Sequence, residues 1–333
     1  MAKKKLRVAL IGCGGNMREA HIPPMLEDGA VDLVAVNDPS EEQARLLMDK
    51  WGATVPFYTD YKKMIKANPL DALLISSPHA MHYDQVKFAL EQDLHVLSEK
   101  PLTISPEHTE ALLKLTGKQN RILIVSYQRN FYAPHLYIRE LIRNGEIGDI
   151  RGVVSYITEN WKATGWRLDP KLSGGGMFFD AGSHLVASTL WMTGLQPVEV
   201  SAFLDNDGRP VDVKMVVNVR FKGGALGTLN TFGNTHRFEG SIAIHGSKGC
   251  IEFRLTTRGV KSLLLNDKPV TIPARIKEDR PDDVFYRLVR NGGKGYELPQ
   301  YTLAVAQVSE AAYRSVEQGK PVTVGKQVKE GRS

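Results

Sequence analysis

Short apolar runs alternate with amphipathic stretches through the first third of the chain. The apolar or β-branched runs are residues 6–11, 31–37, 71–76, 94–99 and 121–127. Between them, apolar residues recur at intervals of three and four, which is typical of helices with one buried face. These helices are expected at residues 39–51, 60–68, 83–92 and 105–118. Strands that alternate with helices in this way predict a doubly wound parallel sheet, covered on both faces.

The pattern changes near residue 128. An amphipathic helix closed by glycine is expected at residues 133–149, and a strand-rich region follows. Its β-branched or alternating stretches, spaced by Gly, Asn and Asp turns, predict a largely antiparallel sheet. These stretches are residues 150–158, 196–205, 212–221, 225–232, 241–253 and 260–267, followed by a helix at 303–320 and a short strand at 321–324. We therefore expect two domains, an α/β domain at 1–127 and an α+β domain at 128–333.

Composition narrows the class of protein. The 333 residues are 42% hydrophobic and 24% charged, as in soluble globular proteins, and this length is comfortable for two cores. The sequence shows neither a secretory leader nor an apolar stretch long enough to span a membrane. Two cysteines, Cys13 and Cys250, make neither a disulfide framework nor a four-ligand zinc site. We expect a cytoplasmic protein.

The net charge of +6 raises the question of nucleic-acid binding. Much of the excess lies in Lys3, Lys4 and Lys5 and in residues 325–333, which are expected to be solvated chain ends. Elsewhere acidic and basic residues alternate, and no basic groove with interleaved aromatic residues is visible. The sequence therefore favours a small anionic ligand over nucleic acid.

A glycine-rich stretch, "IGCGGNMREAH" (residues 11–21), follows the first expected strand. In a dinucleotide-binding turn the first glycine permits a tight bend and the second lets the backbone approach a pyrophosphate. The turn residues expected to bind the cofactor are Gly12, Gly14, Gly15 and Asn16. Met17 replaces the usual third glycine, which alters helix packing but leaves the phosphate cradle. Asp38 ends the second strand, where a carboxylate binds ribose hydroxyls and repels a 2′-phosphate, so NAD is favoured over NADP.

Two further clusters follow later strands of the first domain. In "SSPHAMH", Ser76, Ser77, Pro78 and His82 are expected to line the cofactor, because ligands bind at the carboxyl ends of strands in such sheets. A metal on His79 and His82 is not favoured, because no carboxylate or cysteine partner has a suitable spacing. In "SEKPL", Glu99 and Lys100 end the fourth strand. Beside an oxidised, positively charged nicotinamide this lysine becomes a better proton acceptor, while the alternative is a solvated pair with Glu99.

A fourth cluster lies in "SGGGMFFDAGSHLVASTLWMTG" (residues 173–194), where glycines lead into an apolar helix. Asp180 and His184 are four residues apart and share one helical face. In alcohol oxidation a base removes the hydroxyl proton, and histidine with an orienting carboxylate is suited to this role. The alternative is an ordinary surface pair. The candidate substrate contacts are Arg129, Trp161, Trp166 and Arg167, although tryptophans in a strand-rich domain are usually core residues.

Together these motifs resemble the Gfo/Idh/MocA family, the glucose–fructose oxidoreductase and inositol dehydrogenase type. The resemblance spans nearly the whole chain and includes "IGCGGN", "AVNDPS", "EKP", "GEIGDIRG" and "GGGMFFDAGSH". It implies a Rossmann domain, a second domain with a large open sheet often used for oligomerisation, and NAD(P)-dependent chemistry on a sugar or cyclitol hydroxyl. Carried over by position, Lys100 is the lysine of the E-K-P motif, and Asp180 and His184 are the other catalytic groups. Ala187 stands where the family often has an acidic residue. This departure weakens the assignment of the substrate more than the assignment of hydride transfer.

The resemblance leads us to expect an NAD-dependent oxidoreductase acting on a carbohydrate-like hydroxyl, assembled as a homodimer or homotetramer. Two alternatives stay open at this point. One is NAD-assisted glycoside cleavage, in which a hydroxyl is oxidised only transiently. The other is a regulatory protein that binds NAD without turnover.

Overall fold

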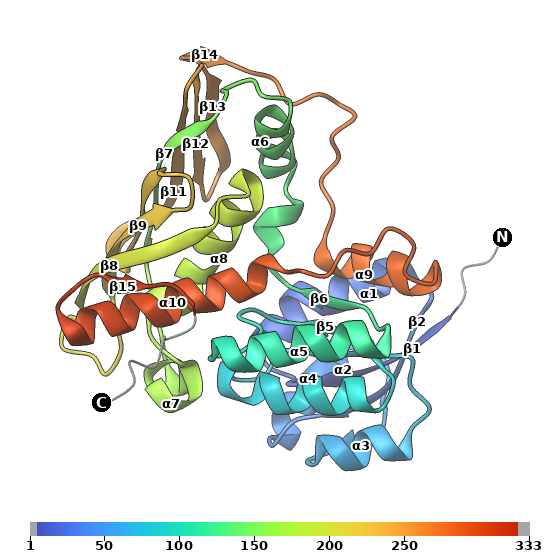
Figure 1. Ribbon diagram of the computed structural model, residues 1–333. Coiled ribbons are helices and arrows are strands. Elements are labelled where there is room, and N and C mark those ends of the chain that lie inside the picture. The colour runs from blue at the N-terminus through green and yellow to red at the C-terminus, as the bar shows by residue number, and fades with distance from the viewer. Residues whose placement is uncertain (1–4, 326–333) are drawn as a thin grey trace. The chain divides into compact units, whose positions relative to one another are not determined.

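The computed structural model describes residues 5–325, which pack into two compact units (Figure 1). The first unit contains residues up to 103, residues 107–128 and a return segment, 279–300. The second contains residues 104–106, 129–278 and the chain from 301 onward. Most of the terminal charges discussed above lie outside the described residues. The return segment differs from a simple division after residue 127, because the chain comes back to the first unit late in the sequence.

The first unit is built on a six-stranded sheet in the order β3-β2-β1-β4-β5-β6, with every pair parallel. Its strands are β1 (Leu6–Ile11), β2 (Val31–Asn37), β3 (Phe57–Tyr58), β4 (Ala72–Ile75), β5 (His95–Ser98) and β6 (Leu123–Val125). The predicted parallel sheet is confirmed, and its residues are almost entirely buried because helices cover it. The strand order reverses between β1 and β4, which makes this the point where such sheets bind ligands.

Helices connect these strands and cover the sheet. They are α1 (Ile22–Asp28), α2 (Glu41–Trp51), α3 (Tyr61–Ala67), α4 (His82–Glu91), α5 (Pro106–Gln119) and, from the return segment, α9 (Pro281–Arg290). Right-handed crossovers that leave β1 in both directions place helices on both faces of the sheet. The helix α9 packs against α1, β5 and β6. The helix α9 is thus part of the first unit.

The second unit is built on a nine-stranded sheet in the order β14-β13-β12-β11-β7-β10-β9-β8-β15. Its strands are β7 (Ile150–Asn160), β8 (Pro197–Asp205), β9 (Lys214–Phe221), β10 (Leu226–Phe232), β11 (Asn234–Gly246), β12 (Cys250–Thr256), β13 (Gly259–Leu265), β14 (Lys268–Pro269) and β15 (Val322–Thr323). All the described pairs are antiparallel except β7 with β10. The expected strand at 241–253 is wrong: a turn at residues 247–249 divides it between β11 and β12. Its Gly246 N–H donates to the carbonyl of Gly249, which closes the hairpin.

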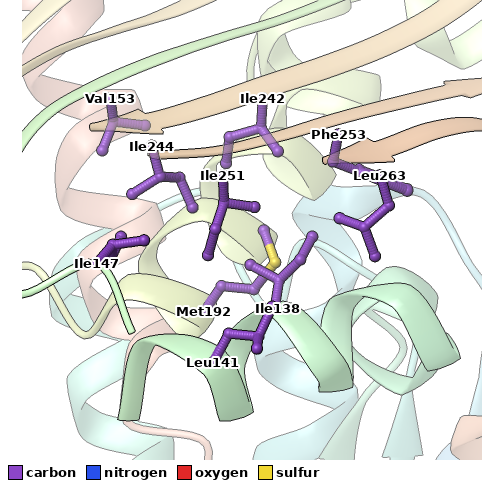
Figure 2. Packing of buried hydrophobic residues seen from close by; sticks show 10 residues of the cluster. All are labelled: Ile138, Leu141, Ile147, Val153, Met192, Ile242, Ile244, Ile251, Phe253 and Leu263. Carbon is purple, nitrogen blue, oxygen red and sulfur yellow. The ribbon is translucent and has the colours of Figure 1, made fainter. Parts of the chain in front are cut away.

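Three long helices cover one face of this sheet. They are α6 (Ala133–Arg143), α8 (Met177–Thr193) and α10 (Tyr301–Gln318), with the short α7 (Pro170–Ser173) before α8. Figure 2 shows one part of the core, where Ile138 and Leu141 of α6 and Met192 of α8 meet apolar side chains of β7, β11, β12 and β13. The strands alternate buried and less buried residues, and within residues 129–278 and 301–325 no helix packs on their other face. Among residues 5–325, no helix combines the length and apolar character needed to cross a bilayer.

Candidate active site

The residues expected to hold the cofactor converge at the carboxyl edge of the six-stranded sheet. Gly12 follows β1, Asp38 follows β2, Ser76 follows β4 and Glu99 follows β5. These strands are neighbours in the sheet, so segments distant in the sequence meet at one edge. The side-chain amide of Asn16 reaches across this edge and donates to Ser76 Oγ over 3.1 Å.

The glycine turn contains two kinds of glycine. Gly12 has φ of +85°, and a Cβ there would lie 2.5 Å from the carbonyl oxygen of Ser76, so this position needs glycine for the fold itself. A Cβ at Gly14 or Gly15 would meet no atom within 4 Å. Among the residues that the structure describes, none requires glycine at these two positions for space. They leave open the backbone surface that a pyrophosphate approaches, so the turn fits a dinucleotide.

The Asp38 carboxylate is buried and held in place from both sides. Its Oδ2 accepts the Cys13 N–H over 2.7 Å, and its Oδ1 accepts the Ser40 N–H over 2.8 Å. Each oxygen keeps a further lone pair for a ribose hydroxyl. The Arg18 guanidinium lies close by, where it donates to the Cys13 carbonyl and to Gln43 Oε1, both over 2.7 Å. Arg18 is not among the residues that the sequence predicts to bind the cofactor.

The surroundings of His82 are those of a residue that stabilises the fold. It is fully buried, with Nδ1 2.8 Å from the Pro101 carbonyl oxygen and Nε2 2.9 Å from that of Ser77. Burial lowers the pKa of this imidazole. The ring connects the loop after β4 with the chain after Lys100, while Ser77 Oγ donates to Gln85 Oε1 over 2.6 Å. Both ring nitrogens therefore face backbone oxygens, which favours an indirect role for His82 in shaping the loop.

Glu99 is connected to two residues that the sequence reading did not single out. Its Oε1 lies 3.1 Å from Nε2 of the buried His21, whose Nδ1 lies 2.9 Å from Oδ1 of Asp282 in α9. Its Oε2 accepts the backbone N–H of Lys100 over 3.2 Å. Glu99 is buried at the end of a strand, as predicted. The residues linked to it come from the stretch after the glycine turn and from the return segment.

In the second unit, α8 carries Asp180 and His184 on successive turns, as their spacing predicts. Its N-terminus is capped by Asp212, which lies before β9. Asp212 Oδ1 accepts the Gly176 N–H over 2.6 Å and the Tyr313 hydroxyl over 2.5 Å, and Oδ2 accepts the Phe178 N–H over 2.8 Å. Burial raises the pKa of Asp212, and these hydrogen bonds oppose the rise.

The glycine run before α8 makes room for the residues that cap the helix. A Cβ at Gly175 would collide with the Tyr313 hydroxyl, and a Cβ at Gly176 would collide with the Asp212 backbone. These glycines therefore let α10 and the segment before β9 approach the start of α8. Their function is to fix the helix that presents Asp180 and His184.

Asp180 accepts hydrogen bonds from two of the residues predicted to contact the substrate. Its Oδ2 accepts the indole N–H of Trp161 and the Nε–H of Arg167, each over 3.2 Å. The Arg167 guanidinium also lies 4.5 Å from the ring centroid of Trp166. Because two donors converge on one oxygen, the carboxylate has a fixed orientation, and Arg167 stabilises its charged form. The structure thus brings together Asp180, Trp161, Trp166 and Arg167.

Arg129 lies in a different environment of the same unit. Its guanidinium lies 5.5 Å from the ring centroid of Phe238, and burial lowers its pKa. It lines a small cavity with His135, Ser188 and Ser241. Burial and the charge of Arg129 lower the pKa of His135 to about 3. The contacts of Arg129 place it beside His135 and Phe238 rather than in the cluster around Asp180.

Two family models match the chain. Residues 6–127 match a model described as an oxidoreductase family with an NAD-binding Rossmann fold. Residues 135–252 match a model described as a GFO/IDH/MocA C-terminal domain. The first match falls in the first unit except for residues 104–106, and the second match falls in the second unit.

Characterised relatives include sugar and cyclitol enzymes. A D-glucoside 3-dehydrogenase of Escherichia coli (strain K12) is 28% identical over 201 residues, which are 60% of this chain and 57% of that protein. A myo-inositol 2-dehydrogenase of Thermotoga maritima is 29% identical over 255 residues, 74% of each chain. Among solved structures, the WlbA dehydrogenase from Bordetella pertussis, in complex with NADH and UDP-GlcNAcA, superposes with a TM-score of 0.84. The match covers 98% of this chain and 100% of that one at 23% identity, which shows a shared fold.

Proposed function

Because this chain belongs to the Gfo/Idh/MocA family of NAD-binding oxidoreductases, we propose that it oxidises a ring hydroxyl of a sugar, sugar derivative or cyclitol, or reduces the corresponding ketone. One observation carries the proposal for this chain. The glycine turn, Asp38 and the strand end that carries Lys100 lie at one edge of the parallel sheet. That edge offers amides for a pyrophosphate, a carboxylate for a ribose and an amine for proton transfer.

A nicotinamide cofactor held at this edge would supply the hydride chemistry, as a hydride acceptor in its oxidised form and a hydride donor in its reduced form. The chain's own residues handle the proton and the substrate. In oxidation, the amine of Lys100 or the imidazole of His184 takes the hydroxyl proton, and in reduction the same group returns it. We propose that Asp180, fixed by Trp161 and Arg167, accepts a hydrogen bond from the substrate hydroxyl and so orients it.

The other residues predicted to contact the substrate indicate which class of substrate would bind. Trp166 and Arg167 stack at 4.5 Å and offer an aromatic face and a cation beside Asp180. Aromatic faces pack against the apolar faces of sugar rings, and guanidinium groups donate to ring hydroxyls or to an anionic substituent. Arg129, whose contacts are with Phe238 and His135, is not part of this group. These groups fit a polar, hydroxyl-rich ring.

Relatives named as dehydrogenases do not favour the glycoside-cleaving alternative. The two reactions differ in one measurable product, because net oxidation accumulates NADH whereas NAD-assisted cleavage regenerates NAD and releases free sugar. A panel of hexoses, glucosides, sugar nucleotides and inositols, each with NAD and with NADP, tests the proposal through absorbance of the reduced cofactor. Product formation without net NADH would overturn it.

The catalytic role of Lys100 is tested in the same assay. Lys100→Ala should abolish turnover while NAD binding stays largely intact. Lys114→Ala, a lysine on the exposed surface of α5 paired with Glu110, is the matched control. Normal turnover in Lys100→Ala would remove the mechanism.

We further propose that the chain forms a homodimer or homotetramer in the cytoplasm, through the uncovered face of the nine-stranded sheet. Apolar side chains of β7, β8 and β10 are exposed there, including Phe203, which is 73% exposed. Light scattering should show an oligomer that Phe203→Glu weakens, whereas Leu46→Glu, on the exposed side of α2, should not. A monomeric wild-type protein would refute this assembly.

A further inference from the structure

A buried imidazole joins three distant segments of the first unit. His21 closes a five-residue π-helical turn, Met17–His21, directly after the glycine turn. Its ring lies between Glu99 at the end of β5 and Asp282 in α9. His21 is 2% exposed and Asp282 is 3% exposed. Ionised carboxylates only accept hydrogen bonds, so the ring satisfies both of them only as an imidazolium, with a proton on each nitrogen.

The surrounding charges favour this imidazolium. Burial alone lowers the pKa of a histidine, but Asp282 and Glu99 outweigh burial and raise the pKa of His21 to about 10. Lys100 and His82 also lie near Glu99, and Tyr286 lies near Asp282 on the same helix. With His82 uncharged, the two carboxylates and the imidazolium leave one net negative charge next to Lys100.

This cluster is connected directly to Lys100. Glu99 uses one carboxylate oxygen for His21 and the other for the backbone N–H of Lys100. The Glu99 side chain thereby sets the direction in which the chain leaves β5. His21 holds the Glu99 side chain, and Asp282 holds His21. Each member restricts the next, so the position of the Lys100 backbone depends on a residue in α9.

We propose that His21 and Asp282 are positioning residues that act through Glu99 to hold Lys100 in its catalytic orientation. The inference rests on the proposed catalytic role of Lys100. Through it, the return helix α9 contributes to a reaction whose other first-unit residues lie far earlier in the sequence.

Two features distinguish this cluster from an ordinary stabilising contact. Buried ion networks are often no more stabilising than apolar side chains of the same volume, so stability alone does not explain three ionised groups here. The π-helical turn also fits a functional role, since such turns frequently occur at functional sites. Here the Ile22 N–H donates to the Met17 carbonyl five residues earlier, and Pro23 and Pro24 follow without N–H donors. The turn places His21 at the buried end of the glycine motif.

The test compares adjacent carboxylates on α9. Asp282→Asn keeps the size of the side chain but removes its charge, so His21 should lose its proton at lower pH. At about pH 8 we expect kcat to fall about ten- to a hundredfold, with much less change in NAD affinity. At about pH 6 His21 is protonated again, so part of the activity should return. Asp283→Asn removes only a partly exposed pair with Arg280 and should retain wild-type kcat at both pH values.

The outcomes separate this inference from the proposed function. An inactive Lys100→Ala with a fully active, folded Asp282→Asn would overturn the positioning role alone. Turnover in both variants would overturn the catalytic role of Lys100 and the positioning role with it. If Asp282→Asn fails to fold, NMR of isotope-labelled histidines in the wild-type protein gives the answer. One imidazolium among the nine histidines should persist at about pH 8.5. Its absence would contradict the inference.

Discussion

The cap on α8 gives a prediction whose size follows from the structure. The Asp212 carboxylate accepts hydrogen bonds from the Gly176 N–H, the Phe178 N–H and the Tyr313 hydroxyl. Asp212→Ala leaves all three donors without this acceptor in a buried environment. The Gly176 N–H also donates to the Tyr313 hydroxyl oxygen over 3.3 Å, so two groups are fully orphaned. Each such group costs about 1–3 kcal/mol, so the second unit should lose at least about 2 kcal/mol of unfolding free energy.

A milder substitution sharpens the same prediction. Asp212→Asn retains one oxygen for Gly176 and Tyr313 but turns an amide N–H₂ toward the Phe178 N–H, so a single donor is orphaned. Its cost should be about 1–3 kcal/mol. Asp207→Asn is the control, because this aspartate is exposed and has φ of +51°, which asparagine also adopts. That change should stay within about 0.5 kcal/mol.

Thermal unfolding checks the order of these effects. For a unit of this size, 1 kcal/mol corresponds to a shift in Tm of about 2–4 °C, so Asp212→Ala should lower the Tm of the second unit by at least about 4 °C. Asp212→Asn should fall between this variant and the control. Equal Tm values for Asp212→Ala and Asp207→Asn would refute the argument, because they would show that the three hydrogen bonds contribute nothing net.

Three further predictions concern the cofactor turn and pH. Gly14→Ala should leave Tm unchanged and weaken NAD binding, measured by calorimetry, whereas Gly12→Ala should lower both, because only its Cβ would collide with the protein. Asp38→Ser should move the NAD-to-NADP ratio of kcat/KM toward NADP, while Asp32→Asn, exposed on β2, should not. His135 is neutral in the fold and has a pKa near 3, below its unfolded value of about 6.5. The unfolded chain therefore binds the extra proton first, and the second unit should lose up to about 1.4 kcal/mol per pH unit as pH falls between these values. Hydrogen exchange should show this loss diminished in His135→Phe.

The periodic elements were predictable because burial alone determines them. Most strand residues of the six-stranded sheet are buried and apolar, and most residues of α8 are buried. Asp180 and His184 could also be predicted as a pair, since helical spacing fixes their common face. The turn at 247–249 was missed because only three residues separate two strands that otherwise read as one continuous β-branched stretch.

The partners of the buried charges were not predictable in the same way. The stretch from Arg275 to Arg287 alternates acids and bases, and that alternation argued only against a basic nucleic-acid groove. Yet Asp282 lies three and four residues before Phe285 and Tyr286, so it shares the buried face of α9. That spacing was the one available signal. It shows which face of the helix is buried but not which residue of the Rossmann sheet will meet it.

The same limit applies to glycines, since one residue type serves three purposes here. Gly12 relieves a backbone collision, Gly176 lets Asp212 reach the start of α8, and Gly14 faces open space. In the sequence these three glycines look the same. They are distinguished only by the atoms that a Cβ at each position would meet. A glycine that the fold itself does not need is the better indication of a ligand, because the atom it makes room for belongs to another molecule. By this reasoning Gly14 and Gly15 argue for the dinucleotide more strongly than Gly12 does, although Gly12 is the more constrained residue.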